Sequence, residues 1–142
     1  MPGFLNPRDL KEMTSEAESA KMDEERQYKL KQEKMKKELH EAFLSRELHP
    51  NVVKRINDAI SIAARQGQHQ IEVLTFPCQY CNDRGRRINN SDADWPDSLE
   101  GFAKKAYEFY ARELKPLGFK LTAEVISFEG GVPGTIAMNL KW

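Results

Sequence analysis

Residues 119–142 read FKLTAEVISFEGGVPGTIAMNLKW, and this stretch decides the class of fold. Apolar and polar residues alternate from Phe119 to Val125, and they alternate again from Ile136 to Trp142. A period of two predicts strands with one buried face. The connection EGGVPG is rich in glycine and proline, which supply the backbone angles of tight turns. The two runs therefore predict an antiparallel β-hairpin.

An earlier strand is predicted at residues 69–76, which read HQIEVLTF. Strict alternation places Ile71, Val73 and Thr75 on one face of this strand. Pro77 closes the run, because proline cannot donate to a central ladder. This strand is expected to join the hairpin in one sheet.

Two shorter helices are predicted on either side of that strand. Residues 50–66 carry a wide apolar stripe at helical spacing. The other helix is expected directly after Trp95-Pro96, with Asp94 or Asp97 as its N-cap. Both helices are amphipathic, so each is expected to bury one face against the sheet.

The resulting fold class is α+β. A long N-terminal helix precedes two shorter helices packed on a small antiparallel sheet of about three strands that ends in the hairpin. Two parts follow from this pattern. Residues 1–49 form an extended N-terminal helix for oligomer or partner contact, and residues 50–142 form the α+β domain.

Composition limits the classes of protein to which the chain belongs. Lys plus Arg and Asp plus Glu each number 22 among the 142 residues, so the formal net charge is zero. This balance argues against a polycation of the histone type. No apolar run is long enough for a signal peptide or a membrane helix, which predicts a cytoplasmic protein without membrane contact. Two cysteines fit a reducing compartment better than a disulfide framework.

The N-terminal helix is expected to run from Pro7 to Leu48. Glycine and proline are absent from residues 8–49, and Asn6 precedes Pro7 as a candidate N-cap. Some 40 residues at 1.5 Å each give a helix of roughly 60 Å, longer than a domain of this size is wide. Much of the helix is therefore expected to lie outside the core.

This helix carries two short apolar stripes at helical spacing. The first consists of Leu10, Met13, Ala17 and Ala20. The second, expected to dock on the domain, consists of Met35, Leu39, Ala42 and Phe43. A long polar helix with short apolar stripes is typical of self-association or docking into a partner. The alternative is a solvated arm without a partner.

A Cys-x-x-Cys pair follows the first predicted strand. Cys78 and Cys81 are placed where a thiol-disulfide enzyme carries its nucleophile, although the residues after them resemble a loop rather than the expected helix. The pair also provides half of a zinc site, which needs two further ligands. The simpler interpretation is two partly buried thiols at a strand end.

The predicted loop at residues 78–94 carries a cluster of arginines. Arg84, Arg86 and Arg87 are candidate anchors for a protein partner or for phosphate groups. Lysines of the long helix extend the nucleic-acid hypothesis, namely Lys29, Lys31, Lys34, Lys36 and Lys37. Alternatively, the arginines pair with nearby aspartates and order their own loop.

From Ile71 onward the chain resembles a group of small uncharacterised bacterial proteins. The resemblance is carried by F-P-x-x-x-C-x-D-x-G-R-x-I-N-N at residues 76–90, then by D-W-P, L-K-P-x-G-F and a closing G-G-x-P-G. It covers about the last half of the chain and implies no activity. Its pattern includes Cys81 but not Cys78, which weakens a site that needs both thiols.

The leading hypothesis is a non-enzymatic interaction or assembly protein. The stripe from Leu10 to Ala20 is its first contact surface, and the three arginines anchor the second. No phosphate-binding loop, metalloprotease or nucleophile-elbow motif occurs, so no catalytic residue is predicted. The alternatives are a nucleic-acid-binding accessory protein, and a zinc or redox protein built on Cys78 and Cys81.

Overall fold

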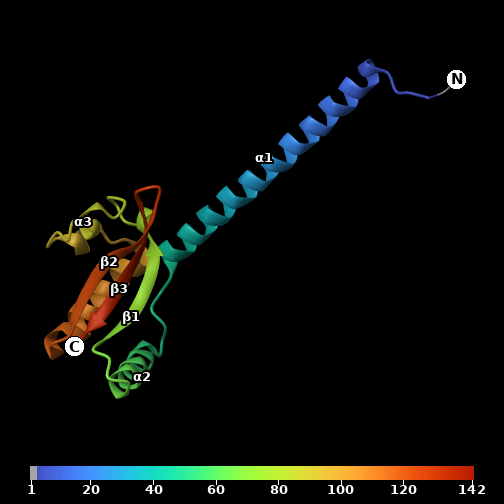
Figure 1. The fold of residues 1–142 in the computed structure, drawn as a ribbon. Coiled ribbons are helices and arrows are strands. Elements are labelled where there is room, and N and C mark those ends of the chain that lie inside the picture. The colour runs from blue at the N-terminus through green and yellow to red at the C-terminus, as the bar shows by residue number, and fades with distance from the viewer. Residues whose placement is uncertain (1–2) are drawn as a thin grey trace. The chain divides into compact units, whose positions relative to one another are not determined.

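The computed structural model describes residues 3–142 (Figure 1). The chain divides into two compact units, of which one ends at Glu41 and the other runs from Ala42 to Trp142. The elements confirm the predicted α+β class, with a long N-terminal helix, further helices and a three-stranded antiparallel sheet.

Helix α1 spans Pro7–Ser45, a length of 39 residues. Its start is the predicted one, because the Asp9 backbone N–H donates to Oδ1 of Asn6 at 2.9 Å. Its end comes three residues before the expected Leu48. Within residues 3–142, no helix is both long and apolar enough to cross a membrane.

The second predicted stripe of α1 is divided between the two units. Phe43 belongs to the second unit, where it is buried, and its ring centroid lies 4.7 Å from that of Tyr80 and 5.6 Å from that of Phe76. Ala42 of the same unit is exposed. Phe43 therefore packs on the domain as expected, whereas the docking of Met35 and Leu39, which belong to the first unit, stays a prediction.

The sheet of the second unit has the strand order β1-β3-β2, and both pairings are antiparallel. Strand β1 spans Gln70–Pro77, β2 spans Lys120–Glu129 and β3 spans Val132–Lys141. The last two strands form the predicted hairpin. In β3, Ile136, Met138 and Leu140 face the core and are almost completely buried.

A β-bulge corrects the predicted faces of β1. Ile71 pairs with Leu140 and Leu74 pairs with Met138, and the register shifts between Glu72 and Leu74. Because one extra residue reverses the alternation, Leu74 shares the core face with Ile71, and Val73 becomes the bulged residue. The predicted face of Ile71, Val73 and Thr75 is therefore wrong beyond its first member.

Helices cover the core face of the sheet. Helix α2 (Val52–Arg65) lies beside β1, and α4 (Gly101–Phe109) lies behind the sheet in Figure 1. A π-helical turn (Tyr110–Leu114) and a 3-10 turn (Lys115–Leu117) extend α4. Ala103 of α4 belongs to the buried core cluster together with residues of β1 and β3, and the partly buried Phe102 packs against this cluster.

The third predicted helix starts later than expected. Residues Trp95–Ser98 form a 3-10 turn, and α4 starts at Gly101 without a side-chain cap from either aspartate. Gly101 has a φ of +58°, and a Cβ there would lie 2.7 Å from the Cα of Leu44. Close packing against the end of α1 therefore positions this helix start, in place of a local cap.

Residues 78–94 are folded rather than an open loop. They contain a 3-10 turn (Cys78–Tyr80) and the short helix α3 (Arg86–Asn89). Ile88 of α3 joins the buried cluster together with both cysteines. The segment therefore forms one end of the core.

Candidate functional site

The apolar residues of α1 before Glu41 lie mostly on one face. We define the stripe as Leu10, Met13, Ala17, Ala20, Tyr28, Met35 and Leu39. At about 100° per residue, these seven positions fall within an arc of about 100°. All are exposed, and the larger ones keep 45% to 65% of their surface in contact with solvent. The first predicted stripe and part of the second are therefore one surface, which only the continuous helix brings into line.

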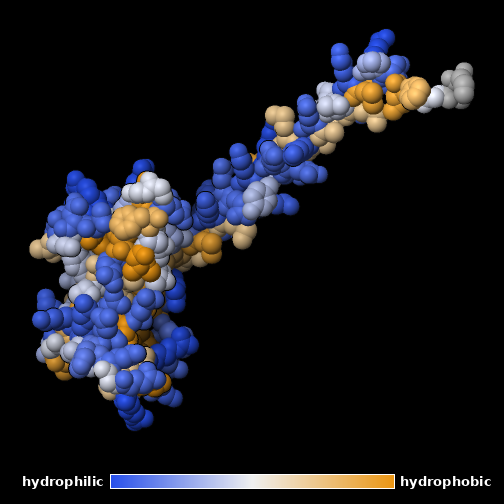
Figure 2. Space-filling view, in the orientation of Figure 1, coloured by the Kyte–Doolittle hydropathy of each residue, from blue (hydrophilic) through white to orange (hydrophobic). Residues whose placement is uncertain are grey.

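Polar residues interrupt the stripe at its middle and in its second half. Lys21 and Glu24 fall on the same arc between Ala20 and Tyr28, and Lys31 and Glu38 fall on it between Tyr28 and Leu39. Two further exposed apolar residues, Met22 and Leu30, lie outside the arc. Figure 2 shows apolar side chains recurring among polar ones along α1. Without a partner, this arrangement leaves large apolar side chains in water.

In the second unit, Asp83 organises the segment that carries the arginines. Its carboxylate accepts hydrogen bonds from the backbone N–H groups of Gly85, at 2.9 Å, and Arg87, at 3.1 Å. Arg87 Nε lies 3.3 Å from a carboxylate oxygen of Asp94 and 3.9 Å from one of Asp83. Arg87 therefore orders its own segment, as the alternative interpretation stated.

The other two arginines are differently placed. Arg84 and Arg86 are exposed. Arg84 has a φ of +59°, a backbone conformation that favours glycine or asparagine and costs a non-glycine residue on the order of 1 kcal/mol. The structure thus separates the three predicted anchors into two exposed cations and one that is engaged within the segment.

The lysines of α1 do not form a single basic face. The group consists of Lys29, Lys31, Lys34, Lys36 and Lys37. A turn of about 100° per residue spreads these five positions over an arc of about 220°. A phosphate backbone passing along one side would contact only some of them.

The Cys-x-x-Cys pair is buried. Cys78 and Cys81 keep 1% and 4% of their surface exposed, and both are free thiols. Burial raises the pKa of Cys81 to about 11, and it raises the pKa of Cys78 as well. Thiol nucleophiles need the opposite shift, so this geometry does not favour redox chemistry.

Tight packing surrounds Cys78. Gly85 has a φ of +85°, and a Cβ at that position would lie 3.2 Å from Sγ of Cys78. Within residues 3–142, no three His, Cys, Asp or Glu side chains stand close enough to hold one metal ion. The pair is placed as the simpler interpretation expected, as small thiols packed at a strand end.

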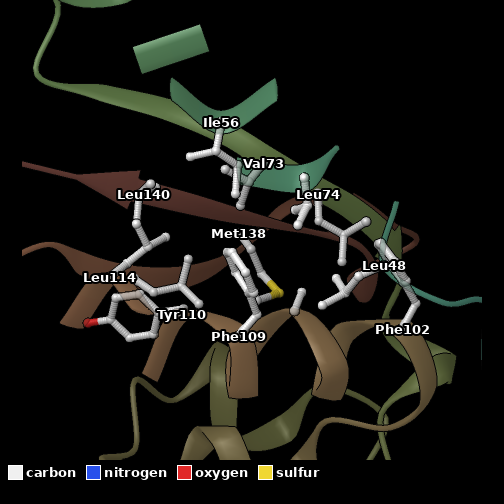
Figure 3. A pocket seen from close by; sticks show the side chains of 13 residues that line it. Leu48, Ile56, Val73, Leu74, Phe102, Phe109, Tyr110, Leu114, Met138 and Leu140 are labelled. Carbon is white, nitrogen blue, oxygen red and sulfur yellow. The ribbon is translucent and has the colours of Figure 1, made fainter. Parts of the chain in front are cut away.

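An apolar cavity of about 100 Å³ lies between α2, α4 and the sheet (Figure 3). Its lining comes from α2, α4 and all three strands of the sheet and includes Ile56, Leu74, Phe102 and Met138. Two backbone irregularities meet there, because the bulged Val73 of β1 and two residues of the π-helical turn contribute to its wall. Among the lining residues, Tyr110 carries a hydroxyl group, and this hydroxyl already donates a hydrogen bond to the Phe119 carbonyl oxygen at 3.0 Å. The cavity therefore offers apolar contact but no acid-base group.

Sequence reasoning missed an exposed apolar patch at the end of the hairpin. Ile126, Phe128 and Val132 are each at least half exposed. Part of this patch is visible on the second unit in Figure 2. The signal was the apolar pair Val125-Ile126, which breaks the alternation where the register of β2 shifts.

Comparison with known proteins finds no match to a family model, a curated protein or a solved structure. The resemblance of residues 71–142 to small bacterial proteins stays a prediction.

Proposed function

We propose that this protein is a non-enzymatic assembly protein whose α1 stripe binds another protein chain. The observation that carries the proposal is the alignment of seven exposed apolar residues on one arc of α1. Helices in proteins owe most of their stability to the packing of one face against other elements, and isolated helices are only marginally stable in water. A partner helix that covers the stripe would supply this packing.

The second recognition surface of the proposal is the segment 78–94, in which the Asp83 carboxylate accepts hydrogen bonds from two backbone N–H groups. Its exposed cations are Arg84 and Arg86. Arg84 has a strained backbone, and strained residues cluster at binding and active sites. Guanidinium groups on a rigid segment suit carboxylates of a partner. Arg87 has a different role, because its ion pairs with Asp83 and Asp94 hold the segment together.

A photo-crosslinking side chain placed along α1 tests the stripe. Substituted at Met13 or Met35, it should give covalent adducts with another protein chain in the producing cell. Substituted at Met22 or Leu30, which are equally exposed but lie off the stripe, it should give several-fold less adduct. Equal adduct formation at all four positions, or none at any, would contradict the proposal.

The nucleic-acid hypothesis is the second candidate, and two observations count against it. The lysines of α1 spread over an arc of about 220° rather than along one side, and Arg87 is engaged by carboxylates. If it holds, binding to a generic oligonucleotide should weaken steeply with salt and depend on Arg84 and Arg86. Unchanged affinity after Arg84→Ala/Arg86→Ala would remove it.

A further inference from the structure

We infer that the chain covering the α1 stripe is a second copy of this protein, with the two α1 helices running antiparallel. This inference rests on the proposed function and deepens it by naming the partner. The distribution of charge along α1 carries it, and the spacing at the two ends of the stripe is compatible with it.

Charge divides α1 into two halves of opposite sign. Residues 8–25 carry seven acidic and three basic side chains, a net charge of −4. Residues 26–41 carry six basic and three acidic side chains, a net charge of +3. An antiparallel pair places each acidic half beside a basic half. A parallel pair would place like charges together along its whole length.

The helix dipole does not account for this division. Acidic residues at an N-terminus and basic residues at a C-terminus stabilise a helix, but the effect is confined to the first and last turns. Here the acidic half continues to Glu25, about five turns into α1, and the basic half starts at Arg26. The segregation therefore extends well beyond the reach of the dipole, as expected if it selects the orientation of a partner.

The two ends of the stripe match each other when one copy is reversed. When two copies align around the peptide bond between Glu24 and Glu25, Leu10 of one faces Leu39 of the other, and Met13 lies opposite Met35, about one residue out of register. The match does not continue to the centre, where Tyr28 of one copy lies opposite Lys21 of the other. Antiparallel pairing therefore brings large apolar residues together at both ends of the contact. A parallel pair would also match each apolar residue with itself, so charge is the feature that selects the orientation.

The overlap in this register covers residues 10–39, which is about 45 Å of helix. The stripe returns to the same side of the helix about every 3.6 residues and so runs nearly parallel to the helix axis. The two helices can therefore stay in contact with little supercoiling. Glu16 and Lys34 lie about five full turns apart, hence on the same flank of the stripe. In the antiparallel pair, Glu16 of one copy approaches Lys34 of the other at two symmetrical places.

Cysteine cross-linking of the full-length chain tests the orientation. Leu10→Cys and Leu39→Cys proteins are prepared separately, mixed and oxidised. The mixture should form several-fold more covalent dimer than either variant alone, because only the antiparallel pair brings these two positions together. Leu10→Cys mixed with Lys37→Cys is the matched control, since position 37 lies off the stripe. The unsubstituted chain controls for Cys78 and Cys81, which are buried.

Charge reversal tests the same geometry without a covalent bond. Glu16→Lys alone and Lys34→Glu alone should each reduce the dimer fraction measured by light scattering. Mixing the two variants should restore it, because the mixed pair regains opposite charges at both contacts. High salt should reduce the difference between the single variants and the unsubstituted chain.

The outcomes separate the inference from the function on which it rests. Self-cross-linking of Leu10→Cys as strong as in the mixture would show a parallel pair and overturn the inference. A monomeric mass, with photo-crosslinks from the stripe to a different protein, would overturn the inference and leave the proposed function standing. A monomeric mass without stripe-specific photo-crosslinks would overturn both.

Discussion

The two units of this chain reach ordered structure by different physical routes. No residue from 3 to 41 is buried, so α1 in this part depends on helix propensity and on intrahelical pairs. The second unit buries Ile136, Met138 and Leu140 almost completely between the sheet and its helices. The comparison teaches that exposed apolar residues mean different things in the two units. In the second unit they are what remains after a core has formed, whereas in α1 they are the surface still available for packing.

The largest expected effect is in the core of the second unit. Ile136→Ala should lower the free energy of unfolding by about 3 kcal/mol, because it removes a fully buried side chain and leaves a cavity. Ile126→Ala, the same change at a half-exposed position of the hairpin, should cost under about 1 kcal/mol. Urea unfolding followed by the fluorescence of Trp95 and Trp142, both in the second unit, measures each variant. Similar losses for both would show that the core is less tightly packed than its burial indicates.

A smaller effect tests whether residues 78–94 belong to the core. Gly85→Ala should destabilise the second unit by about 2 kcal/mol, because both the positive φ and the crowding by Cys78 oppose a side chain. Gly130→Ala shares the positive φ but meets open space, so it should cost about 1 kcal/mol less. The same unfolding measurement compares the two. An equal loss of unfolding free energy in the two variants would mean that residues 78–94 shift to make room for the new methyl group.

The buried thiols make the second unit sensitive to alkaline pH. The pKa of Cys81 rises from its ordinary value of 9.0 to about 11 in the folded chain, chiefly because burial disfavours the thiolate. The folded state therefore binds more protons than the unfolded state between these values, and stability should fall as pH rises from about 9 toward 11. Unfolding free energies at pH 8 and pH 10 check this fall. Cys81→Ala should reduce it, and an unchanged slope in that variant would assign the effect to other groups.

The smallest effect is expected in α1. Tyr28→Ala should change the unfolding free energy of the second unit by less than about 0.5 kcal/mol, because its side chain is exposed and lies in the other unit. Tryptophan fluorescence reports the second unit alone, so the measurement isolates it. The same variant should weaken association through the stripe. A large loss of stability in the second unit would show that the two units are energetically coupled.

Patterns of hydrophobicity were sufficient for most of the fold. The hairpin, both flanking helices and the Asn6 cap follow from local signals, since alternation and capping act over a few residues. The predicted faces of β1 failed after Ile71, because one bulged residue reverses every later position. The start of α4 also failed, since contact with Leu44 determines it and that residue is distant in sequence.

The candidate surfaces were predictable in part. Leu10 and Met13 were found from their spacing, but the alignment of Met35 and Leu39 with them depends on a helix that continues without a break. The sequence could not predict that Arg87 is engaged in ion pairs while Arg84 and Arg86 are exposed, because three arginines within four positions look alike in a local pattern. Which of them finds a carboxylate depends on where the chain places Asp83 and Asp94.

The sequence by itself determined the α+β class, the long polar helix, the hairpin and the opposite charge of the two halves of α1, because each depends on short-range periodicity or composition. Tertiary structure alone decided which side chains are buried. It placed Phe43 in the core, it buried both cysteines, and it turned an apparent loop into the end of the core. Burial depends on contacts between residues far apart in the chain, and a local pattern carries no information about those contacts.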